Sequence, residues 1–384
     1  MQQLKRWLPA LVAAAICLPP AAAWADPDSS FDNADPRAVG SLLRLFTDSG
    51  KVGVRSLMGD YALPVAQKMA LSLHYNNEQV TVPGISAAPG TQEAVDAITT
   101  ASRPISGNAF QDFVKVRNEL NGELTDGPAA VNYYVSTEPD YLAQQLGARY
   151  SKDLDGRQLN VSMGTSLGWD RIDPLADDDT NTSPASKTTL HVNTVATQIL
   201  SPSTLLRYGL EYNIVNGLQY NPYRNVFAGG SIVPERHPEH RERRDAFVKL
   251  NHYFQERTSI KLSYRFYDDD WGINSHELGT KLSQYVTQGL FAQYEYRYYT
   301  QTAARFYRDE YLTPTGVDGY LTGDYRMGPL SSNMFGFALD MDFTKLAADS
   351  PVLQRMGAWF SYERYFNSNN YSANILETGL HVRF

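Results

Sequence analysis

The segment from Asn216 to Arg244 holds the residues of this chain best suited to binding an anion. It contains an Asn-Pro-Tyr-Arg motif at 221–224 and a charge-rich run at 235–244. Guanidinium groups bind carboxylates through charge-assisted, bidentate hydrogen bonds, so the segment could select anions. The alternative is a solvated loop whose charges pair with one another or with phosphates of a lipid surface. The candidate side chains are Tyr223, Arg224, Arg236 and Arg241.

Three groups of residues could hold a metal ion, but none has a complete ligand pattern. His237 and His240 would need a third ligand, and the neighbouring prolines disfavour a helix that would align them. The runs 177–179 and 268–270 are each three aspartates, whose hard oxygens suit calcium. Neither run has the spaced ligands and central glycine of a calcium loop. We therefore expect no metal site.

Nucleophilic catalysis would need a serine, a histidine and an acid at one height of the fold. His252 shares a face with Val248, Leu250 and Phe254, which places it on an apolar surface. No serine elbow or acidic pair accompanies it. We expect no catalytic residues and no cofactor, and an enzyme is the least favoured class.

The elements that position these residues are expected to be β-strands, in which successive side chains point to opposite faces. Apolar side chains alternate with polar ones from about residue 67 to the end of the chain. A soluble sandwich would place its charged face outside and would rarely repeat the pattern so often. Lipid on one side and a polar lumen on the other explain the pattern better. Clear apolar sets run through 69–75, 159–169, 206–214, 260–266 and 335–343.

The polar faces of these segments carry both signs of charge. Such residues could pair across strands as structural supports, or they could create a transverse field that filters solutes. The candidates for a pore lining are Lys261, Arg265, Glu295, Arg297, Asp340 and Glu363.

Both ends of the chain carry export features. Lys5 and Arg6 precede the apolar stretch 8–18, and Ala-Trp-Ala at 23–25 predicts a signal peptide over residues 1–25. The single cysteine, Cys17, would leave with it, so the mature chain would be cysteine-free. The last strand ends in Phe384, which resembles the signal read by the bacterial barrel assembly machinery. These features predict the cell outer membrane, with lipid and lipopolysaccharide as partners.

We predict an all-β fold, a transmembrane antiparallel up-and-down barrel of about 14 strands, within a range of roughly 12 to 16. Residues 67–384 would form the barrel, with tight turns at 153–156, 201–202 and 255–256 on the periplasmic side. Long polar loops near 80–110, 173–185, 216–242, 268–275 and 307–318 would be extracellular. This count requires one continuous strand over 320–343.

Residues 26–66 are expected to form an N-terminal periplasmic or plug segment. A short helix is predicted over 38–46, because Pro36 suits a first helical turn and the apolar residues cluster at helical spacing. Residues 51–62 could be a further strand or part of the plug.

Several stretches in the same order resemble the Gram-negative family catalogued as domain of unknown function 3570. The resemblance implies an outer-membrane barrel and supplies no catalytic residues. Pro139 departs from the expected Ser-x-Glu-x-Asp-Tyr form and puts the start of that strand in question. The stretches are 96–102, 136–141, 221–224, 271–276 and 296–307.

The leading functional prediction is a porin-like route for small polar solutes. The alternative is a closed barrel that anchors or helps assemble a periplasmic or export system, with residues 26–50 contacting a periplasmic protein. A formal net charge of −8 argues against nucleic acid as a partner.

Overall fold

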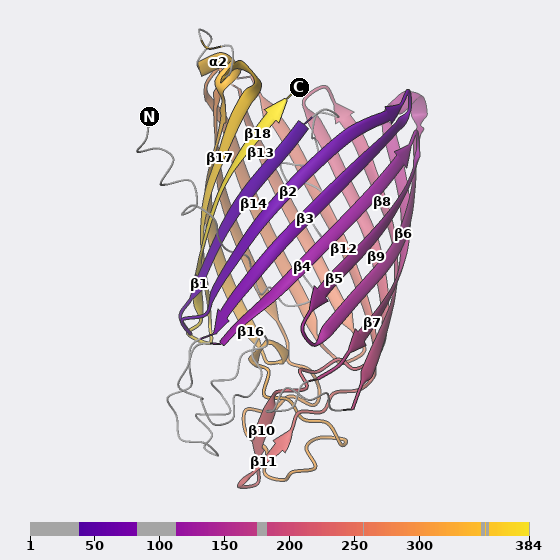
Figure 1. Ribbon diagram of the computed structural model, residues 1–384, viewed down its shortest axis with the longest axis vertical. Helices are drawn as coiled ribbons and strands as arrows, with labels where there is room; N and C mark the ends of the chain where they lie inside the picture. Colours follow the sequence, from indigo (N-terminus) through magenta and orange to yellow (C-terminus); the bar gives the residue numbers. More distant parts are fainter. Residues whose placement is uncertain are drawn as a thin grey trace.

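Alternating residues make the described chain almost entirely β-strand. The computed structural model describes residues 38–82, 113–174, 183–255, 257–346, 350 and 353–383. Within them, sixteen antiparallel strands close into one barrel (Figure 1). The barrel strands are β1 (Ala38–Asp48), β2 (Gly53–Ala66), β3 (Met69–Val82), β4 (Phe113–Asp126), β5 (Ala129–Glu138), β6 (Tyr141–Leu154), β7 (Leu159–Ile172), β8 (Ala185–Ser201), β9 (Thr204–Gly217), β12 (His240–Phe254), β13 (Thr258–Asp269), β14 (Asn274–Thr287), β15 (Leu290–Gln301), β16 (Leu330–Asp342), β17 (Met356–Asn367) and β18 (Ser372–Arg383).

Pairing between the first and last strands closes the ring. β1 lies antiparallel to β18, from Ala38 opposite Arg383 to Asp48 opposite Ala373. All other neighbours follow chain order, except that β9 pairs with β12. The two strands between them, β10 (Asn225–Ala228) and β11 (Ser231–Pro234), form a separate hairpin. Closure leaves no unpaired sheet edge, as a lipid environment requires.

The two faces of the wall differ in chemistry. Large apolar side chains project outward, and Leu210 in the middle of β9 is 66% exposed. Its neighbours Glu211 and Asn213 face inward, beside His191 of β8 and Asp245 of β12. An apolar exterior around a polar interior defines a transmembrane barrel of the outer-membrane type. In the described part of the chain, no helix is long and apolar enough to cross a bilayer.

The predicted all-β barrel is confirmed, but the expected strand number of about 14 is too low. β1 and β2 are the two additional strands. The predicted helix over 38–46 is wrong, because these residues form β1. The apolar residues of 38–46 show helical spacing because both faces of β1 carry apolar side chains. On the lumen face, Phe46 packs in an apolar cluster with Val54, Val80 and Ile375.

Residues 38–66 are therefore barrel wall and no helical plug is seen in the described chain. The signal peptide, residues 26–37, Asp177–Asp179 and Phe384 lie outside the described residues. The export features at both ends remain predictions.

The expected continuous strand over 320–343 is also wrong. β16 starts only at Leu330, and the preceding residues form a loop with a short 3-10 helix, η4 (Tyr325–Met327). The five predicted loops lie at one end of the barrel and the three predicted tight turns at the other, but the expected long loop at 268–275 is only a short turn over 270–273. We call the long-loop end the mouth. At the opposite end β16 and β17 are joined by α2 (Phe343–Leu346) and η5 (Leu353–Arg355), and β6 and β7 by η3 (Asp155–Arg157).

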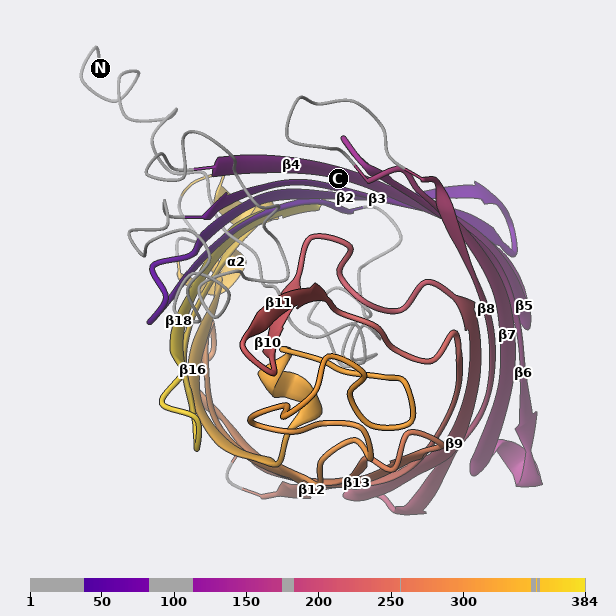
Figure 2. The same ribbon diagram turned by 90° about the horizontal axis from the view of Figure 1, so that it is seen from below.

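Two long loops extend beyond the mouth rim (Figure 1) and lie over the lumen opening, not outside the ring of strands (Figure 2). Residues 218–239, which include β10 and β11, and residues 302–329 lie within the ring of strands when the barrel is viewed from the mouth (Figure 2). We call these two segments together the mouth insert. Sixteen strands enclose a lumen of porin size, wider than the sequence predicted.

Candidate functional site: mouth insert and lumen wall

Backbone pairing joins the two halves of the mouth insert. Gly229 and Gly230, both at positive φ, make the tight turn between β10 and β11. The Gly229 amide donates to the carbonyl of Tyr311 at 2.8 Å. Arg236 and Leu321 exchange two backbone hydrogen bonds of 3.0 and 2.9 Å. Segments far apart in sequence thus behave as one small sheet-like unit.

Apolar packing gives this unit its own core. Val226 and Ala228 of β10 pack against Tyr311 and Leu321 of the second loop. The Tyr311 hydroxyl donates to the carbonyl of Phe306 at 2.8 Å and accepts from the Thr322 amide at 3.0 Å. A second cluster ties the insert to the barrel rim and contains Trp271, Ile273, Ala304 and Phe306.

A buried ion pair locks the insert. Nη1 of Arg224 lies 3.2 Å from Oδ1 of Asp324, and both side chains are nearly inaccessible to solvent. Nε of Arg326 donates to both oxygens of Asp324, at 2.8 and 3.0 Å. Burial of the Asp324 carboxylate opposes its ionisation, but Arg326 and Arg224 outweigh burial and hold its pKa well below the ordinary range.

Glu235 makes a second buried polar contact between the two loops. Its carboxylate accepts hydrogen bonds from the Thr322 hydroxyl and from the Gly323 amide. Nε2 of His237 lies 3.3 Å from the same carboxylate, and the His237 ring packs edge-on against Trp271. His240 instead contacts Asn216 and Glu242. The two histidines therefore have separate partners, and the described residues contain no cluster of three or more metal-ligand side chains.

The predicted arginines of this segment have different environments. Arg241 is buried, donates to Asp269 Oδ2 through Nε at 3.0 Å and stacks 4.1 Å from the Trp271 ring centre. Arg224 is buried in the insert, as described above. Arg236 is exposed at the mouth. Tyr223 donates its hydroxyl to Asp140 at 2.5 Å and ties the insert to the turn after β5. The structure thus does not gather the three arginines into one anion site.

The predicted pore-lining residues all lie on the inward face of the wall. Arg265 bridges Asp245 at 2.8 Å and Glu211 at 3.3 Å. Glu295 pairs with Lys281 at 2.9 Å, and Arg297 lies 3.7 Å from Glu277. Lys261, Asp340 and Glu363 share this inward register.

Sequence reasoning missed several residues of the site. Asp324 and Thr322 were assigned to a strand, so their role in the insert was not foreseen. The acidic-aromatic-basic triplet at 324–326, next to a glycine, is the signal that could have indicated a turn instead. Arg207, Arg243 and Glu78 line the lumen beside the predicted residues, and strand register would have identified them once pairing was known.

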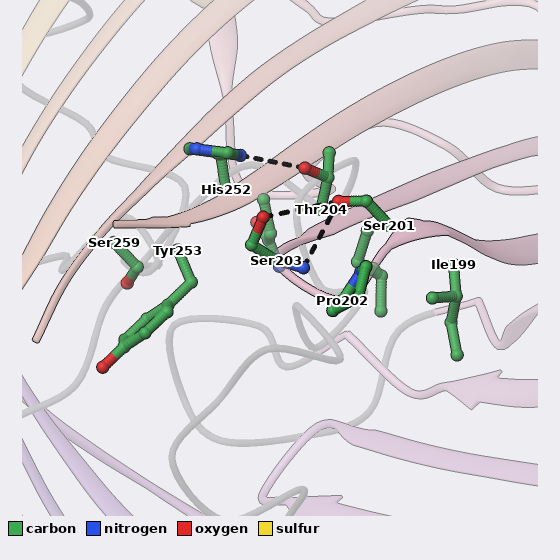
Figure 3. Close-up of a pocket in the computed structure, with 10 residues that line it drawn as sticks. Ile199, Ser201, Pro202, Ser203, Thr204, His252, Tyr253 and Ser259 are labelled. Carbon is green, nitrogen blue, oxygen red and sulfur yellow. Dashed lines mark hydrogen bonds between the residues drawn. The ribbon is translucent and has the colours of Figure 1, made fainter. Parts of the chain in front are cut away.

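A rim hollow of about 340 Å³ lies at the tight-turn end, between the β8–β9 turn and β12 (Figure 3). Thr204 Oγ1 lies 2.9 Å from Nδ1 of His252, and the Ser201 and Ser203 hydroxyls contact each other. The ten lining residues include no carboxylate that could orient the histidine as a base. His252 packs its ring against Phe254, as expected for a residue at the membrane interface.

The fold and the two-faced wall define a bacterial outer-membrane β-barrel protein. Within that class, residues 8–354 match the model of the family described as Protein of unknown function (DUF3570), and the chain belongs to this family. The sequence resemblance is thereby confirmed. A search of curated proteins finds no match to this chain.

Solved outer-membrane proteins share the barrel at low identity. The ferric enterobactin receptor PfeA of Pseudomonas aeruginosa aligns with a TM-score of 0.44 and 10% identity, over 86% of this chain and 53% of the receptor. OccK11 of the same organism aligns with a TM-score of 0.41 and 11% identity, over 91% of this chain and 96% of OccK11. OccAB3 of Acinetobacter baumannii aligns with a TM-score of 0.37 and 9% identity, over 91% of this chain and 98% of OccAB3. This chain spans about half the length of the receptor, and likeness at this level identifies no ligand.

Proposed function

We propose that this protein is an outer-membrane channel for small polar solutes, narrowed at its mouth by the insert. The observation that carries the proposal is a charged, polar lining around a sixteen-strand ring, since rings of this size leave room for water. Paired charges such as Arg265 with Glu211 and Asp245 keep that lining hydrated.

The mouth insert would set the size limit. Its backbone pairing, its apolar clusters and the Arg224–Asp324 ion pair hold it in one position across the lumen. Arg236, which stays exposed there, is the arginine of this loop best placed to meet an entering anion.

Reconstitution in planar bilayers tests the channel directly. We expect discrete conductance steps from purified wild-type protein. The paired change Arg224→Gln with Asp324→Asn should loosen the insert and give larger, noisier openings. Arg244→Gln is the matched control, because Arg244 is 59% exposed and pairs with Glu242 away from the insert.

A closed barrel that serves as an anchor or assembly partner is the second candidate. The dense packing of the insert, in which Ala304 and Leu321 are each only 1% exposed, favours it. Bilayers that stay silent with both wild-type protein and the loosened insert would contradict the channel and support this candidate. Residues 38–48 form strand β1 of the barrel wall. Of the segment 26–50 that was predicted to contact a periplasmic partner, this leaves residues 26–37 for the contact.

A further inference from the structure

Cations concentrate on one arc of the lumen wall. Strands β9, β12, β13 and β14 are consecutive in the ring, and we call their inward face the basic arc. Below the Arg241–Asp269 pair of the mouth, this face carries only three carboxylates, those of Glu211, Asp245 and Glu277. Its cations number twice as many: Arg207, Arg243, Lys249, Lys261, Arg265 and Lys281.

Carboxylates concentrate on another arc. The inward register of β16, β17 and β18 carries four acids and, among the described side chains, no lysine or arginine. Outward neighbours Phe335, Tyr362 and Leu380 are 41–50% exposed, which confirms the direction of the two faces. We call this inward face the acidic arc, and its acids are Asp340, Asp342, Glu363 and Glu377.

One row of the barrel shows the change of sign. Successive backbone partners across β13 to β17 are Lys261, Lys281, Glu295, Gly336 and Glu363. Two cations are thus followed, at the same level of the hydrogen-bonded ladder, by two carboxylates. Gly336 separates the two acids, and a Cβ there would lie 3.3 Å from Glu295 Cβ and 3.6 Å from Glu363 Cγ. Because Gly336 has no side chain, no group between Glu295 and Glu363 covers their carboxylates.

Each arc retains a charge without an ion-pair partner among the described residues. On the basic arc these are Arg207 and Arg243, whose buried Nε–H groups find no hydrogen-bond acceptor in the described chain. On the acidic arc it is Glu363, for which the described residues provide neither a salt bridge nor a hydrogen bond. Charges that protein groups do not neutralise remain able to act on a solute.

We propose that the solutes of this channel are small zwitterions, with an anionic carboxylate or phosphate facing the basic arc and an ammonium group facing the acidic arc. This inference rests on the proposed channel. A dipolar solute can align its two ends with the two arcs, so both contacts are favourable. An ion of one sign is attracted by one arc and repelled by the other, so its net interaction with the lumen is less favourable than that of a zwitterion.

Proteoliposome swelling tests this with glycine as the zwitterion and glycolamide as a neutral solute of similar size. We expect wild-type protein to admit glycine faster than glycolamide. Arg207→Gln with Arg243→Gln, and separately Glu363→Gln, should each lower the glycine-to-glycolamide ratio by about two- to fivefold, as the loss of a charge contact in a hydrated lumen predicts. A fall of the glycine-to-glycolamide ratio in both variants distinguishes a channel for zwitterions from a filter for ions of one sign.

Matched controls remove charges from the outer surface. Arg171→Gln and Glu242→Gln should leave the ratio unchanged, because both side chains lie on the outward register near the mouth. An unchanged ratio in the lumen variants would overturn the zwitterion proposal while leaving the channel intact. Opposite effects from the two arcs would also overturn it and indicate a filter for ions of one sign. Absence of swelling with every solute would overturn the channel itself, and the inference with it.

Discussion

Arg224 of the first inserted loop and Asp324 of the second form an ion pair of 3.2 Å that is almost fully removed from solvent. A buried carboxylate is costly unless opposite charges and hydrogen bonds compensate it, and here Arg224, Arg326 and the Arg326 amide do so. The pair therefore couples the positions of two loops that meet only over the lumen.

Acid should release this coupling. The folded pKa of Asp324 is depressed, so its stabilising contribution is complete above the unfolded value of about 3.9 and is lost as the pH falls toward the folded pKa. Protease cleavage within 302–329 should therefore be slow at neutral pH and should accelerate only below about pH 4. Asp324→Asn should make cleavage faster at neutral pH and flatten this acid dependence. A wild-type profile in the variant would contradict this role.

Arg241 should be among the most sensitive positions at the rim. Arg241→Met would leave the fully buried Asp269 carboxylate without its cation, which costs about 3–5 kcal/mol of unfolding free energy. Arg244→Met, at a solvent-exposed pair, should lower the free energy of unfolding far less. Urea unfolding of the liposome-inserted protein measures both. Equal effects at the two positions would show that burial of the pair is unimportant.

Tyr311→Phe isolates the hydroxyl that bridges the second loop. The change leaves the Phe306 carbonyl and the Thr322 amide without a partner, at a cost of about 1–3 kcal/mol. Tyr307→Phe is the control, because its hydroxyl contacts Asp309 at an exposed site. Hydrogen exchange of the Thr322 amide should rise in the first variant and stay at the wild-type rate in the second. Unchanged protection in Tyr311→Phe would refute the bridge.

Charge on the lipid face should be penalised and charge on the lumen face tolerated. Leu210→Arg places a guanidinium near the middle of β9 on the outer surface and should destabilise the barrel by about 2–4 kcal/mol. Ser166→Arg, on the inward register of β7 opposite His191, should cost much less. Folding titrations in lipid vesicles provide the comparison. A similar loss for both would argue that β9 does not face lipid.

The sequence by itself determined the class of fold, since alternating residues such as Leu210 and Glu211 must separate lipid from water whatever the strand order is. It also indicated most of the long loops, although residues 270–273 form only a short turn where a long loop was expected. It could not determine β1, because Phe46 faces the lumen inside an apolar cluster and so removes the alternation that indicates a strand. The same limit applied to residues 320–329, where Tyr320 and Met327 pack against the cluster at the rim and so mimic the apolar residues of a lipid-facing strand.

Only the tertiary structure decided how the charges are used. Arg224, Arg236 and Arg241 look equivalent in the sequence, yet two are buried in ion pairs with Asp324 and Asp269 and one is exposed. The separation of cations and acids onto two arcs likewise depends on strand register and closure. The physical reason is that a charge acts through its distance to other charges, and in a barrel those distances are set by partners far away in the chain.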